Sequence, residues 1–180
     1  MATVTPQGMA DLRLLDAWRT SNRVTIYLIE QLGPELWVAP LPGSPRRSVG
    51  MMASHLHNAR CRWIRALGSE LGVAVPSMVE RRATRRQVVS ALRQSSRGVL
   101  AVLRIGCEHG GSIPPTPAYS WRNLPLDVGH VLCYLVAHEG HHRGQIVMAA
   151  RALGARLPAE VTNGLWQWTR RSAEAKASPR

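Results

Sequence analysis

His138 and His142 are the two residues of this 180-residue sequence whose type and spacing most directly allow chemistry. Both lie in an apolar segment with helical periodicity, residues 126–153. Residues four apart on an α-helix differ by about 40° around its axis, so the two imidazoles project from one face. Imidazoles one turn apart can bind the same divalent transition metal ion. The spacing therefore predicts a metal site on this helix.

The rest of that helical face indicates that the two histidines point toward the protein interior. Apart from one glutamine the face is apolar, and its other members are Val131, Leu135, Gln145, Ile146, Ala149 and Leu153. A buried imidazole needs a partner for each ring nitrogen. We favour a metal as that partner because one ion satisfies two rings at once. His130 and His141 lie about 60° or more from this face, so we expect them to be exposed.

A mononuclear metal site needs a third protein ligand, and it keeps an open position if it is catalytic. The predicted helix at residues 49–67 contains His55 and His57, which lie about 200° apart around its axis and cannot both face one site. They flank the apolar arc of this helix almost symmetrically, so periodicity does not choose between them. His109, in a loop, is a further candidate. The residues alone leave the third ligand open.

Residues 138–142 also match HExxH, the zincin pattern in which the glutamate is a general base. The context is poor for a peptidase, because no third histidine follows and only Glu160 could imitate a downstream acidic ligand. No strand precedes the helix to hold a peptide substrate. Glu139 lies about 100° from the two histidines around the helix, which also counts against it as a base. We therefore disfavour a peptidase.

Helical periodicity predicts five helices, at residues 9–32, 49–67, 84–105, 126–153 and 158–171. Ser48 and Thr84 are suitable N-caps, and strand signals are absent. Four long helices most simply form a four-helix bundle, here an all-α single domain spanning residues 1–180 with a short C-terminal helix. The Pro- and Gly-rich stretch 106–125 is long for a loop, which is typical of a lid or one wall of a site.

Composition narrows the classes of partner and compartment. The net charge is +12, but the arginines are scattered, and the one cluster, at residues 81–86, lacks interleaved aromatic residues that could stack bases. We expect a solvated helix start there and no specific nucleic-acid partner. No segment is apolar enough to span a membrane, and the N-terminus does not look like a secretory signal. Cys61, Cys107 and Cys133 are odd in number and form no CxxC, so we expect free thiols and a cytoplasmic location.

Residues 136–154, VAHEGHHRGQIVMAARALG, resemble the DinB/YfiT-like family of four-helix metal-binding proteins, whose hallmark is HxxxHRGQ. Residues 157–171 resemble the end of a common branch of the same family. Its other landmark is a histidine on the second helix, flanked by apolar residues and followed by an aromatic residue eight positions on. His55 with Trp63 matches this landmark, so the resemblance selects His55 over His57.

The resemblance implies an up-down-down-up bundle in which His55, His138 and His142 bind one zinc or nickel ion per chain, with water completing the shell. It also implies a homodimer. Gln145 completes the motif and lies on the ligand face, where it could orient a ligand; Glu139 is a further candidate for such a role. Many relatives have a histidine where this chain has Tyr134, which could instead offer its hydroxyl to a substrate. Gly140 and Gly144 would allow a neighbouring helix to approach closely.

Relatives include enzymes dependent on low-molecular-weight thiols, such as mycothiol-dependent maleylpyruvate isomerase and bacillithiol transferases. The resemblance therefore implies a metal-dependent thiol S-transferase or related detoxifying enzyme, acting on a small thiol and an electrophile. Arg60 and Arg122 are candidates for binding the thiol's carboxylates. The alternatives are a metal-dependent hydrolase with Glu139 as base, and a metal-binding stress-response protein without turnover.

Overall fold

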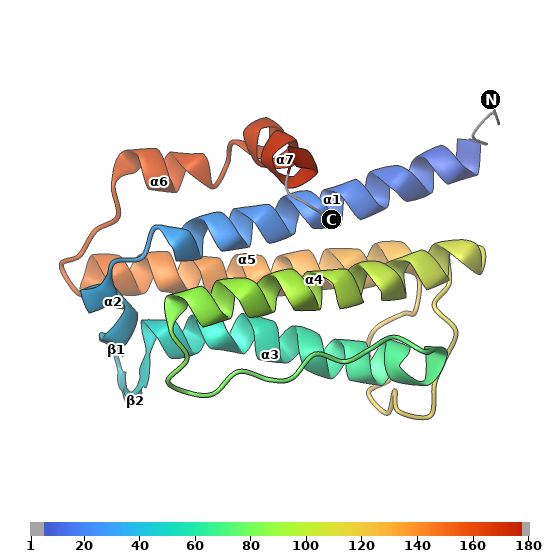
Figure 1. Cartoon of the computed structure of the whole chain (residues 1–180), viewed down its shortest axis with the longest axis horizontal. Helices are drawn as coiled ribbons and strands as arrows, with labels where there is room; N and C mark the ends of the chain where they lie inside the picture. Colours follow the sequence, from blue (N-terminus) through green and yellow to red (C-terminus); the bar gives the residue numbers. More distant parts are fainter. Residues whose placement is uncertain (1–5, 178–180) are drawn as a thin grey trace.

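Four long helices run side by side in the computed structural model, which describes residues 6–177 (Figure 1). They are α1 (Pro6–Glu30), α3 (Val49–Gly68), α4 (Arg85–Glu108) and α5 (Val128–Ala152). Helix α4 packs against α1, α3 and α5, and α5 also packs against α1 and α3. Figure 1 shows α1 and α5 running in one direction and α3 and α4 in the other. The predicted all-α class is confirmed.

Local hydrogen bonds explain where three of these helices begin. The Ser48 hydroxyl accepts from the Met51 amide at 3.2 Å, as expected of an N-cap. Thr84 and Gln87 form a reciprocal capping box at the start of α4. Helix α5 starts two residues later than predicted because Asp127 caps it, accepting from the His130 amide at 3.1 Å.

The expectation that the chain contains no strand was wrong. In the link after α1, the helix α2 (Pro34–Val38) is followed by an antiparallel hairpin of β1 (Pro40–Leu41) and β2 (Ser44–Ser48). Gly43, at φ 71°, makes the turn, and the strands are too short to show an alternating pattern. After α3 comes a 3-10 turn, η1 (Ser69–Leu71).

The predicted C-terminal helix is split into α6 (Ala159–Gly164) and α7 (Trp168–Ala177). The chain passes the Tyr27 ring so closely at Gly164 that an added Cβ would lie 2.5 Å from the Tyr27 hydroxyl. Helix α7 then packs along α1. Tertiary contact with α1, which periodicity does not report, determines this end of the fold.

The core consists of two apolar clusters separated by a polar layer. One cluster contains Leu28, Leu56, Leu92 and Ile146, and the other contains Trp18, Ile64, Val99 and Leu135. Between these positions, each long helix contributes a buried polar residue; these include Thr25, Arg60, Ser95 and Glu139. The polar layer crosses the middle of the four helices, at the level of the histidines described below.

The 109–127 connection between α4 and α5 is anchored at both ends. Ile113 is fully buried, and its amide donates to the Leu126 carbonyl at 2.7 Å. The Thr116 hydroxyl donates to the Ala66 carbonyl of α3 at 2.6 Å, which holds the loop against that helix. Among residues 6–177, no helix is long and apolar enough to cross a membrane.

Candidate metal centre

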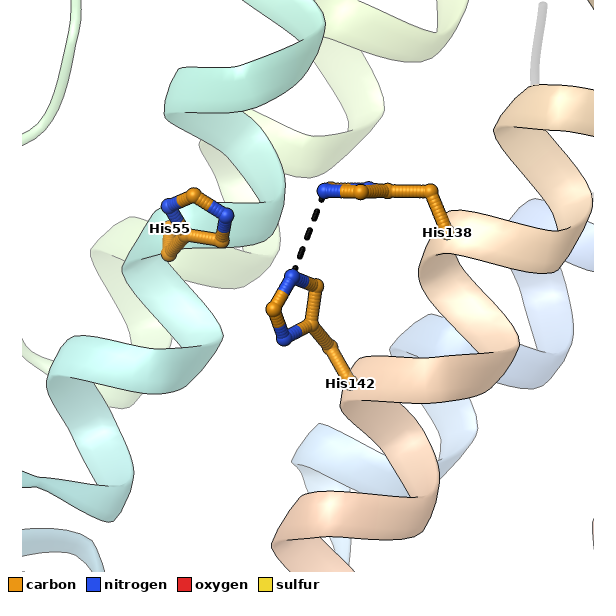
Figure 2. Close-up of side chains that lie close together, drawn as sticks. All are labelled: His55, His138 and His142. Atoms are coloured by element: carbon orange, nitrogen blue, oxygen red, sulfur yellow. Dashed lines mark hydrogen bonds between the residues drawn. The ribbon is translucent and has the colours of Figure 1, made fainter.

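Three histidines from two helices converge in the space between α3 and α5 (Figure 2). His55 projects from α3, and His138 and His142 project from α5. Each can offer one ring nitrogen, and the three nitrogens lie within 4.8 Å of one another. The Nε2 atoms of His138 and His142 are 3.2 Å apart. Nitrogens bound to one tetrahedral zinc ion lie roughly 3.3 Å apart, so this pair already fits, and the three histidines could bind a metal ion.

Gln145 fixes the orientation of one of these rings. Its Oε1 lies 2.7 Å from His142 Nδ1, one helical turn along α5. An amide oxygen can only accept, so the ring donates from Nδ1 and keeps an unprotonated Nε2 directed at His138. An outer hydrogen bond of this kind is the usual way in which a protein orients a metal-binding imidazole. Gln145 itself is exposed, unlike the apolar members of the predicted face.

The surroundings keep these imidazoles neutral. Burial, followed by the neighbouring imidazoles and by Arg47 and Arg62, lowers the pKa of His55 to about 4. Burial is also the main reason why the pKa values of His138 and His142 lie below the ordinary histidine value. A neutral imidazole is the form that binds a metal, because protons compete for the same lone pair. The histidines are therefore in a ligand-competent state near neutral pH.

A model of the DinB family matches residues 3–173. The chain belongs to the DinB family. Comparisons with curated proteins and with solved structures found no match. The family resemblance expected from the sequence is confirmed.

His57, the other candidate on α3, is part of the buried core and does not face the cluster. It is fully buried, its Nδ1 lies 3.1 Å from the Ser95 hydroxyl, and its Nε2 lies 2.9 Å from the Ser77 carbonyl. Cys61 Sγ is a further neighbour, 3.3 Å from Nε2. Both ring nitrogens have protein partners, so His57 is not available to the cluster. The question that periodicity left open is answered by packing: His55 lies with the other two histidines.

The remaining histidines do not join the cluster. His109 lies at the end of α4, where its Nδ1 is 2.7 Å from the Ile105 carbonyl. His130 is exposed and pairs with Asp127 at 3.1 Å. His141 is exposed too, with its ring centroid 5.1 Å from that of His142. The predicted exposure of His130 and His141 is confirmed, and His109 as a third ligand is not supported.

Glu139 lies on a face of α5 adjacent to that of the histidines, about 60–100° around the helix axis, and points into the core. Only 1% of it is exposed, Oε1 accepts from Arg60 Nε at 2.6 Å, and Oε2 accepts from the Thr25 hydroxyl at 2.7 Å. Arg143 approaches the same carboxylate to 3.8 Å and donates to Thr25. With both oxygens occupied, Glu139 forms no hydrogen bond to the three histidines among the described residues. This geometry does not support Glu139 as a ligand-orienting residue or a general base.

The same network corrects the expectation for Arg60. Its side chain is 1% exposed and is held by Glu139, by Asn22 and by the Leu92 carbonyl, so it cannot meet a substrate carboxylate. Arg122 is exposed but does not line the cavity next to the histidines. The arginine that does line it is Arg62, which sequence reasoning did not single out.

A cavity of about 390 Å³ adjoins His55 and His138. Tyr134 lines it, with its ring stacked near that of His138 at a centroid distance of 6.2 Å and an interplanar angle of 17°. Residues 118–121 of the long loop line it as well. Part of the long loop thus lines the cavity next to the histidines, and its role as one wall of a functional site stays a prediction. Tyr119 and Trp121 were missed, although two aromatic residues in a Pro- and Gly-rich loop were a usable signal.

Proposed function

We propose that this DinB-family protein binds one divalent transition metal ion, zinc or nickel, through His55, His138 and His142, and is a thiol S-transferase. The observation that carries the proposal is the convergence of three imidazoles whose donor nitrogens lie within 4.8 Å of one another, two of them, His55 and His138, lining an open cavity. Three protein ligands leave a coordination position for a small molecule. When bound, such an ion is a Lewis acid that lowers the pKa of a thiol or water ligand.

The chain's own residues provide binding and orientation. The histidines hold the ion, and Gln145 orients His142. The loop at residues 118–121 and the Tyr134 ring line the cavity beside the histidines. Arg47 and Arg62 place positive charge close enough to His55 to lower its pKa, which favours an anionic thiol. In the reaction, the thiol loses its proton to solvent, and its sulfur bonds an electrophilic carbon whose leaving group departs with the bonding electrons.

The finer structural expectations belong to the same proposal. We propose that the chain is one domain with an up-down-down-up four-helix bundle, which the opposite directions of α1 and α5 against α3 and α4 support (Figure 1). A Cβ built at Gly144 would meet nothing within 4 Å, so no helix of this chain packs there among the described residues. A second copy packing at Gly144 would give the expected homodimer. A cytoplasmic detoxification or stress-response role is consistent with three free cysteines.

Metal loading followed by thiol addition tests the proposal. Protein stripped by chelation should take up about one Co²⁺ per chain. Small thiols should then produce a sulfur-to-cobalt charge-transfer band in the near ultraviolet, and a thiol–electrophile pair should give an S-conjugate detectable by mass spectrometry. The matched control is His141→Ala, which removes an exposed neighbour of the cluster.

The outcomes separate the candidate functions. Cobalt uptake without a charge-transfer band for any thiol would overturn the transferase and leave a metal-binding protein. Failure to bind cobalt, nickel and zinc would overturn the metal site itself.

A further inference from the structure

The cavity beside the histidines contains an unusual share of the chain's aromatic residues. The sequence has six tryptophans, three tyrosines and no phenylalanine. Two tryptophans and two tyrosines, Trp63, Trp121, Tyr119 and Tyr134, line this cavity. They come from α3, α5 and the loop between α4 and α5, so the fold gathers them from three separate parts of the sequence.

These rings pack against one another as a contiguous aromatic wall whose planes are inclined at 58°, 68° and 58°, so a flat ligand can stack on one ring and meet the edges of its neighbours. The Trp63 centroid lies 5.3 Å from that of Trp121 and 5.1 Å from that of Tyr134. Trp121 and Tyr134 are 5.7 Å apart. Tyr134 in turn stacks near His138, so the wall ends at the histidine cluster. A molecule that contacts this wall therefore has one edge next to His138 and the proposed metal site.

Small residues keep the space in front of the wall open. Ala59 and Ala66 lie on α3 on either side of Trp63 and line the same cavity. The volume of about 390 Å³ is within the range of small-molecule sites and suits a one- or two-ring compound. Trp121 remains 43% exposed, so part of its ring is accessible to a ligand at the opening of the cavity.

The charge at the cavity is positive. Arg62 lines it, is exposed, and forms no hydrogen bond or ion pair with any residue in the described range 6–177. No aspartate or glutamate is among the lining residues. The guanidinium is therefore free to bind a carboxylate, for which its planar donors are well suited.

We propose that this cavity binds a planar aromatic carboxylate, with its ring on the Trp63–Trp121–Tyr134 wall and its carboxylate at Arg62. The proposal rests on the proposed function only in giving such a molecule the role of electrophile. The binding step itself uses no metal. Aromatic contacts add to the affinity beyond the area they bury, by roughly two- to tenfold per ring pair, so the site should prefer an aromatic ring to a saturated one.

Titration calorimetry with 2-naphthoate tests the wall, using protein as purified and after chelation. Trp121→Ala should weaken binding by about tenfold, whereas Trp166→Ala should not. Trp166 is the matched control because it is 82% exposed and lies between α6 and α7, far from the cavity-lining loop (Figure 1). Decahydronaphthalene-2-carboxylate, the saturated analogue, should bind about tenfold more weakly than 2-naphthoate. Equal binding of the two compounds, or unchanged binding by Trp121→Ala, would overturn the proposal.

A second pair of variants tests the charge. Arg62→Gln should weaken 2-naphthoate binding by about tenfold and leave the neutral 2-naphthamide unchanged. Arg65→Gln, on the same helix but outside the cavity lining, should change neither. Equal loss of both compounds in Arg62→Gln would contradict the role of its charge. Because 2-naphthoate should bind chelated protein as well, loss of metal binding or of S-transfer leaves this result unaffected, and the two proposals can fail separately.

Discussion

His138 and Glu139 are neighbours in sequence, yet they belong to two polar regions of opposite character. On one face of α5, His138 and His142 are half-buried beside His55 of α3, and His142 lies within hydrogen-bond distance of His138 and Gln145. On the adjacent face, Glu139 is fully engaged by Arg60 and Thr25 in the core. One region leaves its donor atoms available for a ligand, and the other uses them to join helices.

The buried region holds the open one in place. Arg60 Nη1 donates to Asn22 on α1 and to the Leu92 carbonyl on α4, while Nε donates to Glu139 on α5. Its guanidinium also lies over the Trp18 ring, 4.8 Å from the centroid. Burial alone would raise the pKa of Glu139, but Arg60 holds it below its usual value. The pair fixes α3 against α5, and therefore His55 against His138.

The largest effect should come from breaking this pair. Glu139→Ala leaves the Arg60 charge buried without its counter-ion, and we expect a loss of about 3–5 kcal/mol in the free energy of unfolding. Urea denaturation of the metal-free protein measures it. A double variant, Arg60→Met with Glu139→Leu, should recover most of the loss because no charge is then stranded. A single variant as stable as the wild type would refute the role of the pair.

Removing one imidazole of the histidine cluster should have the opposite effect: metal affinity should fall while stability changes little. His142→Ala should lower zinc affinity by more than the roughly 100-fold that marks the upper limit for removing an outer partner. Its unfolding free energy without metal should change little, because His142 is half-buried and, within residues 6–177, hydrogen-bonds only to neighbours on its own helix. Competition with a chromophoric chelator measures the affinity. Full metal content in this variant would exclude the proposed site.

The two histidines of α3 sharpen the comparison within a single helix. His57→Ala should cost about 1–3 kcal/mol of stability, because the Ser95 hydroxyl and the Ser77 carbonyl lose a buried partner, and it should keep zinc. His55→Ala should keep its stability and lose zinc. Thermal melts and metal analysis of both variants test this, and the reverse pattern would mean that the wrong histidine has been assigned.

Gln145→Ala should give the smallest effect. Water can replace the exposed amide, so zinc affinity should fall by only about tenfold, the lower limit for an outer partner. Gln145→Glu, which keeps an acceptor oxygen, should retain the wild-type affinity. An unchanged affinity in the alanine variant would show that the bond to His142 Nδ1 does not orient the ring.

Local patterns in the sequence were enough to predict the long helices and two of the three proposed metal ligands. The periodicity of residues 126–153 placed His138 and His142 on one face, because that relation depends only on helix geometry. Ser48 and Thr84 were recognisable as caps for the same reason: their partners are three residues away. The short hairpin and the break at Gly164 were missed because they depend on a tight turn and on the Tyr27 ring.

Tertiary structure decided which side chains from different helices contact one another. Periodicity places His55 and His57 symmetrically, and only the packing of α3 against α4 and the 77–79 segment turns His57 away. The HExxH pattern suggested a catalytic glutamate, but Arg60, 79 residues distant in sequence, binds that carboxylate in the core. The aromatic wall likewise joins residues from three segments. Sequence fixes the angle between residues on one helix, whereas the partners of each face depend on contacts between distant segments.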